Sequence, residues 1–353
     1  MLFGYPEQAT AENWIHDCIV AAVTKVHQHI ELGRRLPRWP AIILPSHQDK
    51  LRRRTGLRDR LSTYAKELRR LATADRQLVL DAIADQNRIQ DLLAGQHDCR
   101  SLEELPPAIR EPALALFTYA FGLLTEFGTR QRQYKAVCDV IPAKVCPYCG
   151  CENLEAPGLP QEDLDHYLPR SKYPFAAANL RNLAPMGGRC NSAYKRTQDP
   201  LKRDDGTRRR AFYPFLTTPL RISLENSVVD ELTPGPVISD WVIEFDPSDE
   251  PSDTWDEIFK IRQRWKENFL DDKTFRKWLR EFSAYCKSPN QHVATDEEVV
   301  DAIKGYQEYL AVCGFEGQAF LKAATFELLH RHCQAGSQRL IPLFRELAGV
   351  AQP

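Results

Sequence analysis

The sequence predicts an α+β protein that is mostly helical, and three observations support this fold class. Apolar residues recur at three- and four-residue steps on both sides of the chain's centre, as in amphipathic helices. A turn-rich segment with metal-ligand residue types lies between them, and short alternating segments that follow it predict strands. We therefore expect a helical N-terminal region (1–140), a compact module (141–215) and a mixed C-terminal region (216–353) with short strands before helices.

The N-terminal region reads as successive helices. The first is expected over about 11–33, and Pro37, Pro40 and Pro45 separate it from the next. The apolar run 113–124 follows Pro112 at a plausible helix start, and it is too short to span a bilayer. One further helix is predicted by an apolar stripe whose members are Leu61, Tyr64, Leu68 and Leu71.

The C-terminal region combines two predicted strands with helices. Residues 220–224 and 241–245 alternate as strands do. Thr295 with Glu298 forms a capping-box pattern for a helix through Leu310. Two apolar stripes rich in aromatics could form a base-stacking surface, but we favour core packing for them: Trp255, Ile258, Ile261, Trp265 and Phe269, then Phe275, Trp278, Leu279 and Phe282.

Composition limits the classes of partner and compartment. Lys and Arg number 47 against 48 Asp and Glu, so any attraction to phosphate must come from local clustering of charge. Ten cysteines in 353 residues are too sparse for a disulfide scaffold. The N-terminus has neither a basic segment nor a long apolar segment typical of secretion, so we expect a cytoplasmic protein without a membrane span.

Three cysteines predict a metal site. Cys146 and Cys149 have the spacing of a zinc knuckle, and Cys190 is the expected third ligand. A second knuckle would place cysteine at position 187, where this chain has Gly187. A fourth ligand from Cys138, His330, His332 or Cys333, a three-cysteine site completed by water, and a finger that has lost its zinc remain open.

Asp165 and His166 form the predicted chemical centre. On a strand they would point to opposite faces, so one side chain can reach a cation while the other reaches a water near the same phosphate. A lone histidine is usually structural, but the neighbouring motifs favour a functional one. They are Asn182-Leu183-Ala184-Pro185 and Cys190-Asn191-Ser192-Ala193-Tyr194-Lys195.

In this order, the three motifs resemble an HNH endonuclease, the ββα-metal or His-Me finger fold, over roughly 60 residues. The resemblance implies that His166 is the general base, with an imidazole suited to neutral pH. It implies that Asp165 and Asn191 bind a catalytic Mg²⁺ or Mn²⁺ through oxygen. It also implies that Asn182 holds the loop and orients the histidine, and that Lys195 contacts the scissile or adjacent phosphate.

The resemblance implies a hydrolase that cleaves phosphodiester bonds, and we expect DNA rather than RNA as its substrate. By analogy with HNH modules that carry large extensions, the flanking regions are expected to bind a partner such as an ATPase in a bacterial antiviral defence system. The alternative is an inactive, zinc-stabilised nucleic-acid-binding or scaffold protein. A redox protein built on Cys146 and Cys149 is less favoured, because the βαβ context is missing.

Two basic clusters are candidate contacts for nucleic acid. We expect the first to be a solvated face and the second to contact phosphate, because it follows the predicted site directly. The first comprises Lys50, Arg52, Arg53, Arg54, Arg58 and Arg60, and the second Lys195, Arg196, Lys202, Arg203, Arg208, Arg209 and Arg210. No base-reading motif is visible.

Overall fold

The computed structural model describes residues 1–159, 164–216, 219–231, 235–288 and 293–350. The protein is a mostly helical α+β protein, as predicted. By its internal contacts it divides into two compact units, one of residues 1, 3–141 and 154–218, the other of residues 2, 142–153 and 219–353. Residues 154–215 of the predicted central module thus lie in the same unit as the N-terminal helices, while residues 142–153 lie with the C-terminal region.

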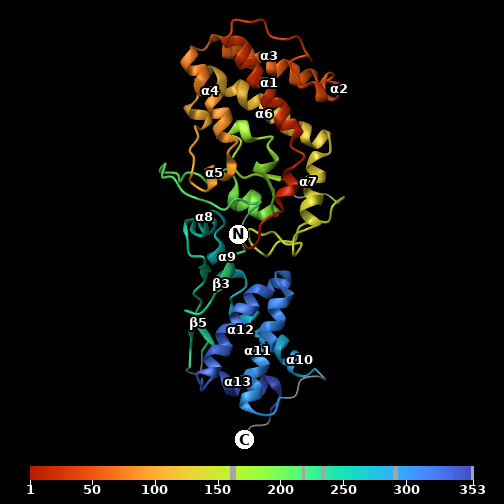
Figure 1. Ribbon diagram of the computed structural model, residues 1–353. Helices are drawn as coiled ribbons and strands as arrows, with labels where there is room; N and C mark the ends of the chain where they lie inside the picture. The colour runs from red at the N-terminus through yellow and green to blue at the C-terminus, as the bar shows by residue number, and fades with distance from the viewer. Residues whose placement is uncertain (160–163, 217–218, 232–234, 289–292, 351–353) are drawn as a thin grey trace. The chain divides into compact units, whose positions relative to one another are not determined.

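The helices of the first unit occupy most of the N-terminal half (Figure 1). They are α1 (Trp14–Glu31), α2 (Gln48–Leu51), α3 (Thr55–Arg70), α4 (Thr73–Gln86), α5 (Ile89–Leu93), α6 (Pro107–Glu126) and α7 (Thr129–Cys138). Short 3-10 turns accompany them at η1 (Glu7–Thr10), η2 (Pro45–His47), η3 (Leu102–Glu104), η4 (Pro174–Ala176) and η5 (Leu180–Asn182). The first predicted helix, over 11–33, is confirmed as α1.

The apolar run that contains Ala113 lies in α6, a largely buried helix, as predicted. Its start was wrongly placed at Pro112, because α6 begins five residues earlier at Pro107. Proline is tolerated in the first turn of a helix, where its missing N–H has no helical partner. Pro107 occupies that place, and Pro112 lies inside the helix.

The first unit also contains a small antiparallel hairpin of β1 (Leu164–His166) and β2 (Leu183–Pro185). A single turn of π-helix, η6 (Cys190–Lys195), follows it. Leu164 and Leu183 of the hairpin belong to the same hydrophobic core as α1, α3, α4 and α6, together with residues such as Phe175 from the connecting loop. The helices therefore form the scaffold on which the hairpin and its loop are packed.

The second unit contains two further two-stranded antiparallel sheets and six helices among its described residues. Strand β3 (Arg221–Ser223) pairs with β6 (Glu244–Asp246), and β4 (Val228–Val229) pairs with β5 (Ile238–Asp240). Strand β3 lies within the predicted segment 220–224, whereas β6 only overlaps the end of 241–245. The helices are α8 (Glu250–Phe259), α9 (Ile261–Asn268), α10 (Asp272–Cys286), α11 (Asp296–Cys313), α12 (Ala319–Gln334) and α13 (Leu340–Ala348), with the short turn η7 (Glu316–Gln318).

The aromatic stripes pack inside the second unit. Trp255, Trp265 and Trp278 are all buried, and the Trp255 and Trp265 ring centroids lie 5.9 Å apart. Core packing is therefore confirmed over a base-stacking surface. The capping box at the start of α11 is also confirmed, because Thr295 accepts from the Glu298 N–H while the Glu298 carboxylate accepts from the Thr295 N–H.

Candidate functional site

Asp165 and His166 are placed by the β1–β2 hairpin. Asp165 lies opposite Ala184 and His166 opposite Leu183 in the antiparallel ladder. Successive residues of a strand point to opposite faces. Accordingly the Asp165 side chain is turned into the protein, with 6% of the residue exposed, while His166 is only half-buried. The pair thus presents a buried carboxylate beside an imidazole that reaches toward the surface.

The His166 ring is fixed by two contacts. Its Nε2 lies 3.0 Å from the carbonyl oxygen of Ala177, which can only accept, so Nε2 carries the proton in the neutral ring. The ring also packs against the Phe121 ring of α6, with the two ring centroids 4.4 Å apart. Burial, and secondarily the positive charge of Arg170, lowers the pKa of His166 to about 3. The imidazole is therefore neutral at pH 7, and Nδ1 holds the lone pair.

Asn182 holds the loop that carries the acceptor of His166. Its side chain is fully buried and binds the backbone of Leu168 in both directions: the Leu168 N–H donates to Oδ1 at 2.7 Å, and Nδ2 donates to the Leu168 carbonyl at 3.0 Å. Nδ2 also lies 3.3 Å from the carbonyl of Ala176, the neighbour of Ala177. These bonds tie the loop to the residues that follow β1.

Lys195 lies inside the protein and not at its surface. The residue is fully buried, and its ammonium donates to the Gln198 carbonyl at 2.9 Å and lies 3.8 Å from Asp165 Oδ2. Burial raises the pKa of Asp165 and lowers that of Lys195, while each charge opposes the shift of the other. This placement differs from the expected contact with phosphate, because Lys195, the last residue of η6, has its ammonium beside Asp165 of β1.

Asp165 Oδ2 is a buried polar atom without a hydrogen-bond donor among the described residues. Buried carboxylates are normally hydrogen-bonded or paired, and Lys195 at 3.8 Å is too distant for a hydrogen bond. Asn191 lies in η6, four residues before Lys195, and is half-buried. Oxygen donors of these two types are the ligands that hard divalent cations prefer.

Buried amides of the helical region fix the same loop, and they were missed in the sequence. Gln133 of α7 donates to the carbonyls of Leu180 and Leu183 at 2.9 and 3.0 Å. Asn13, just before α1, accepts from the Leu180 N–H at 2.9 Å and donates to Asn179 at 3.2 Å. Isolated Gln and Asn residues carry no sequence signal of this kind, because their partners are backbone atoms far along the chain.

Part of the second basic cluster is engaged inside the first unit. Arg209 is buried and donates twice to the Asp199 carbonyl, while Arg208 donates to the carbonyls of Leu92 and His97. Guanidinium groups used in this way hold segments of backbone together. They are not a solvated surface for phosphate.

Two arginines outside both predicted clusters act electrostatically on His166, and the effect of Arg170 is the largest of any charged group. Arg170 is exposed four residues after His166, and its positive charge lowers the pKa of His166. Arg130 acts in the same direction and lies over the Phe121 ring at 5.0 Å. The neighbourhood of the histidine is therefore positive, which suits an anionic substrate.

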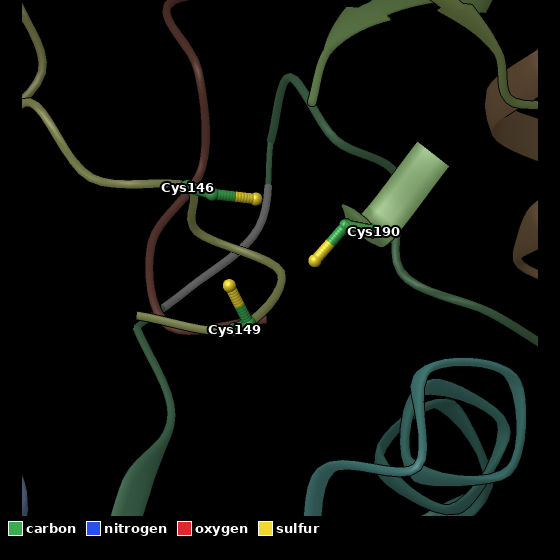
Figure 2. Close-up of side chains that lie close together, drawn as sticks. All are labelled: Cys146, Cys149 and Cys190. Carbon is green, nitrogen blue, oxygen red and sulfur yellow. The ribbon is translucent and has the colours of Figure 1, made fainter. Parts of the chain in front are cut away.

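The three predicted metal-binding cysteines lie together. The sulfurs of Cys146, Cys149 and Cys190 are all buried and within 4.8 Å of one another, and Figure 2 shows them pointing toward a common centre. Thiolates about 2.3 Å from a tetrahedral zinc would have this mutual spacing. The cluster could therefore bind a metal such as zinc. No fourth ligand from the described histidines, cysteines or carboxylates joins it, so the expected candidates, Cys138, His330, His332 and Cys333, do not complete the site there.

The Cys146–Cys149 turn has a well-defined backbone. The Gly150 N–H donates to the Cys146 carbonyl at 2.7 Å, and Gly150 has a φ of +67°, which favours glycine. A Cβ at Gly150 would lie 2.7 Å from the Phe320 ring. Trp265 of α9 donates from Nε1 to the Cys149 carbonyl at 2.9 Å, so the turn is fixed from outside as well.

No described helix combines the length and the apolar composition needed to cross a bilayer. Comparison with known protein families, with curated proteins and with solved structures finds no match to this chain.

Proposed function

We propose that this protein is a metal-dependent endonuclease of the HNH type that hydrolyses phosphodiester bonds in DNA. The observation that carries the proposal is the pairing of Asp165 and His166 on β1. One has an unsatisfied buried oxygen, and the other has a ring fixed with Nδ1 as its lone-pair atom. The order hairpin strand, hairpin strand, helical turn matches the order of the motifs that resemble an HNH nuclease.

His166 would act as the general base toward the attacking water. The Ala177 carbonyl keeps the proton on Nε2, so the ring needs no rearrangement before Nδ1 accepts a proton. A pKa of about 3 makes the imidazole a weak base in the free protein. The negative charge of a bound phosphodiester acts in the opposite direction to Arg170, so we expect the pKa to rise when substrate binds.

Asp165 and Asn191 would hold the catalytic Mg²⁺ or Mn²⁺. When bound, such a cation supplies positive charge that stabilises the transition state and the departing 3′ oxygen. Lys195 lies beside Asp165 and carries the same sign of charge as the proposed metal ion. Burial lowers the pKa of Lys195, so its ammonium gives up its proton more easily. This reduces the electrostatic cost of binding the metal ion at Asp165. Arg130 and Arg170 are the candidate phosphate contacts, in place of the second basic cluster.

For the cysteine cluster we propose a structural Zn²⁺ ion. Three buried thiols in one place are more favourable as metal-bound thiolates than as separate polar groups, and a zinc ion would join Cys190 to the Cys146–Cys149 turn. The ion would have no part in the reaction. A protein partner, for example an ATPase in bacterial defence, and a cytoplasmic location remain part of the proposal by analogy only.

Plasmid cleavage tests the proposal. Supercoiled DNA is incubated with the full-length protein and Mg²⁺ or Mn²⁺, with His166→Ala compared against wild type and against His332→Ala, a half-buried histidine of the second unit. Loss of a general base should slow scission by roughly 100- to 10,000-fold, while the control variant cuts as wild type does. Equal rates for His166→Ala and wild type, or no scission by wild type with either metal, would overturn the assignment.

One observation favours the alternative, a catalytically inactive nucleic-acid-binding or scaffold protein. Lys195 already compensates Asp165, so the buried carboxylate can be neutralised without a cation. In that case the wild-type protein would bind DNA without metal-dependent scission, and His166→Ala would leave the affinity unchanged. A gel-shift titration of both proteins at fixed salt separates the two functions.

A further inference from the structure

A pocket of about 470 Å³ lies in the first unit, away from the Asp165–His166 pair. Its lining comes from α1, α3 and the segment 36–42 that follows α1. Val26, Leu61 and Ile42 give it an apolar floor, and the half-buried indole of Trp39 forms part of its wall. This volume is within the range of small-ligand sites, roughly 300–1,000 Å³.

The polar part of the pocket is positive. Its lining contains Arg58, Lys66 and Arg69 of α3, with the Ser62 hydroxyl between them, and no acidic side chain. Arg58 pairs with Asp59 at 2.8 Å, whereas Lys66 and Arg69 have no carboxylate partner in the described part of the chain. Lys66 and Arg69 are three residues apart on a helix and therefore share one face, about 4.5 Å apart along its axis.

Exposed arginines strengthen this positive potential. Arg38 lies in the segment 36–42, and Arg34 and Arg35 come just before it; all three are exposed. Arg58 was expected to belong to a solvated face, and it also lines the mouth of this pocket. An anion would be attracted to this mouth, and an apolar group attached to it would be accommodated by the floor.

The segment that closes the pocket is held by two hydrogen bonds, one to its backbone and one from the Trp39 side chain. Lys25 of α1 donates to the Ala41 carbonyl at 3.1 Å, and the Trp39 indole N–H donates to the Arg52 carbonyl at 2.8 Å. The wall is therefore formed before any ligand arrives, and a ligand would not have to order it. The indole N–H is already engaged, so Trp39 offers a ligand its ring and not a hydrogen bond.

We propose that this pocket binds a nucleoside monophosphate or a close relative, with the base against Trp39 and the phosphate at Lys66 and Arg69. A phosphate monoester carries nearly two negative charges at pH 7, whereas a carboxylate carries one. The phosphate monoester therefore matches the two adjacent cations better. Stacking of a base on an aromatic ring contributes roughly 1–3 kcal/mol. A nucleotide would therefore use both the indole and the cations of this pocket. The site is independent of the proposed nuclease function.

Isothermal titration calorimetry with AMP, GMP, CMP and UMP, each in a separate experiment, tests the proposal. At least one should bind in a 1:1 ratio, while ribose 5-phosphate, which lacks the base, and octanoate, which lacks the phosphate, should bind at least about tenfold more weakly. The double variant Lys66→Glu/Arg69→Glu should weaken the nucleotide at least about tenfold, and Trp39→Leu should also weaken it.

Arg53→Glu is the matched control, because Arg53 is an exposed cation near α3 that does not line the pocket. It should bind the nucleotide within about twofold of wild type, and circular dichroism should show that all variants are folded. The proposal is overturned if none of the four nucleotides binds, or if the double variant binds as wild type does. Tighter binding of octanoate than of every nucleotide would likewise overturn it and assign an acyl carboxylate instead.

Discussion

Replacing Lys195 with methionine should destabilise the first unit strongly, because the change removes the only ion-pair partner that Asp165 has among the described residues. Methionine is close to lysine in length, so the packing is largely retained and the charge is the main loss. Asp165 Oδ2 is buried and 3.8 Å from the ammonium, and the ammonium also binds the Gln198 carbonyl. Breaking a buried ion pair from one side costs about 3–5 kcal/mol.

The loss should depend on pH in a defined direction. Without Lys195 the pKa of Asp165, already raised by burial, rises further above its unfolded value of about 4. A carboxyl whose folded pKa is raised loses folding stability as the pH increases from its unfolded pKa toward its folded pKa. The deficit of Lys195→Met relative to wild type should therefore be larger at pH 8 than at pH 5.

Urea unfolding followed by circular dichroism at both pH values measures this effect. The double variant Lys195→Met/Asp165→Asn removes both charges and should recover a substantial part of the loss, roughly 2–3 kcal/mol. Lys172→Met is the matched control, because Lys172 pairs with Asp199 at 3.4 Å but its side chain is 41% exposed, and it should cost about 1 kcal/mol or less. A loss of under about 0.5 kcal/mol for Lys195→Met, or strict additivity in the double variant, would refute the reasoning.

Three further predictions follow from the same contacts. His27 is buried against the Tyr64 hydroxyl and has its pKa lowered to about 4. Because this pKa lies below the unfolded value, folding stability is lost as the pH falls below about 6.5. His27→Gln should therefore remove about 2 kcal/mol of the difference in unfolding free energy between pH 7 and pH 5, measured by urea titration. Asn182→Ala leaves the Leu168 N–H and carbonyl without their side-chain partner and should cost about 3 kcal/mol of unfolding free energy in the same assay. A cost under about 1 kcal/mol would contradict a stabilising role for these two hydrogen bonds. Cys190→Ser should lower the zinc content of the purified protein, measured by elemental analysis, whereas Cys313→Ser on α11 should not; equal zinc in both variants would exclude Cys190 as a ligand.

Local sequence patterns were sufficient for much of the helical fold. The limits of α1, the capping box of Thr295 and the burial of the aromatic stripes follow from periodicity and from short-range hydrogen bonding, which depend on neighbours in the chain. The start of α6 was missed because Pro107 and Pro112 both satisfy the local rule for a helix start. The hairpin β4–β5 was missed because strands of two and three residues carry almost no periodic signal.

The sequence by itself determined which residues lie next to the predicted chemistry: Asp165 and His166 alternate on one strand, and Cys146 and Cys149 share one turn. Only the tertiary structure decided which charges are buried. Lys195 looks like a phosphate contact in the sequence, yet it is fully buried beside Asp165, because the path of η6 and not the residue type sets the direction of its side chain. The hydrogen bonds of the Gln133 amide could likewise not be predicted from the sequence. Its partners are backbone carbonyls some fifty residues away, which only the fold brings near.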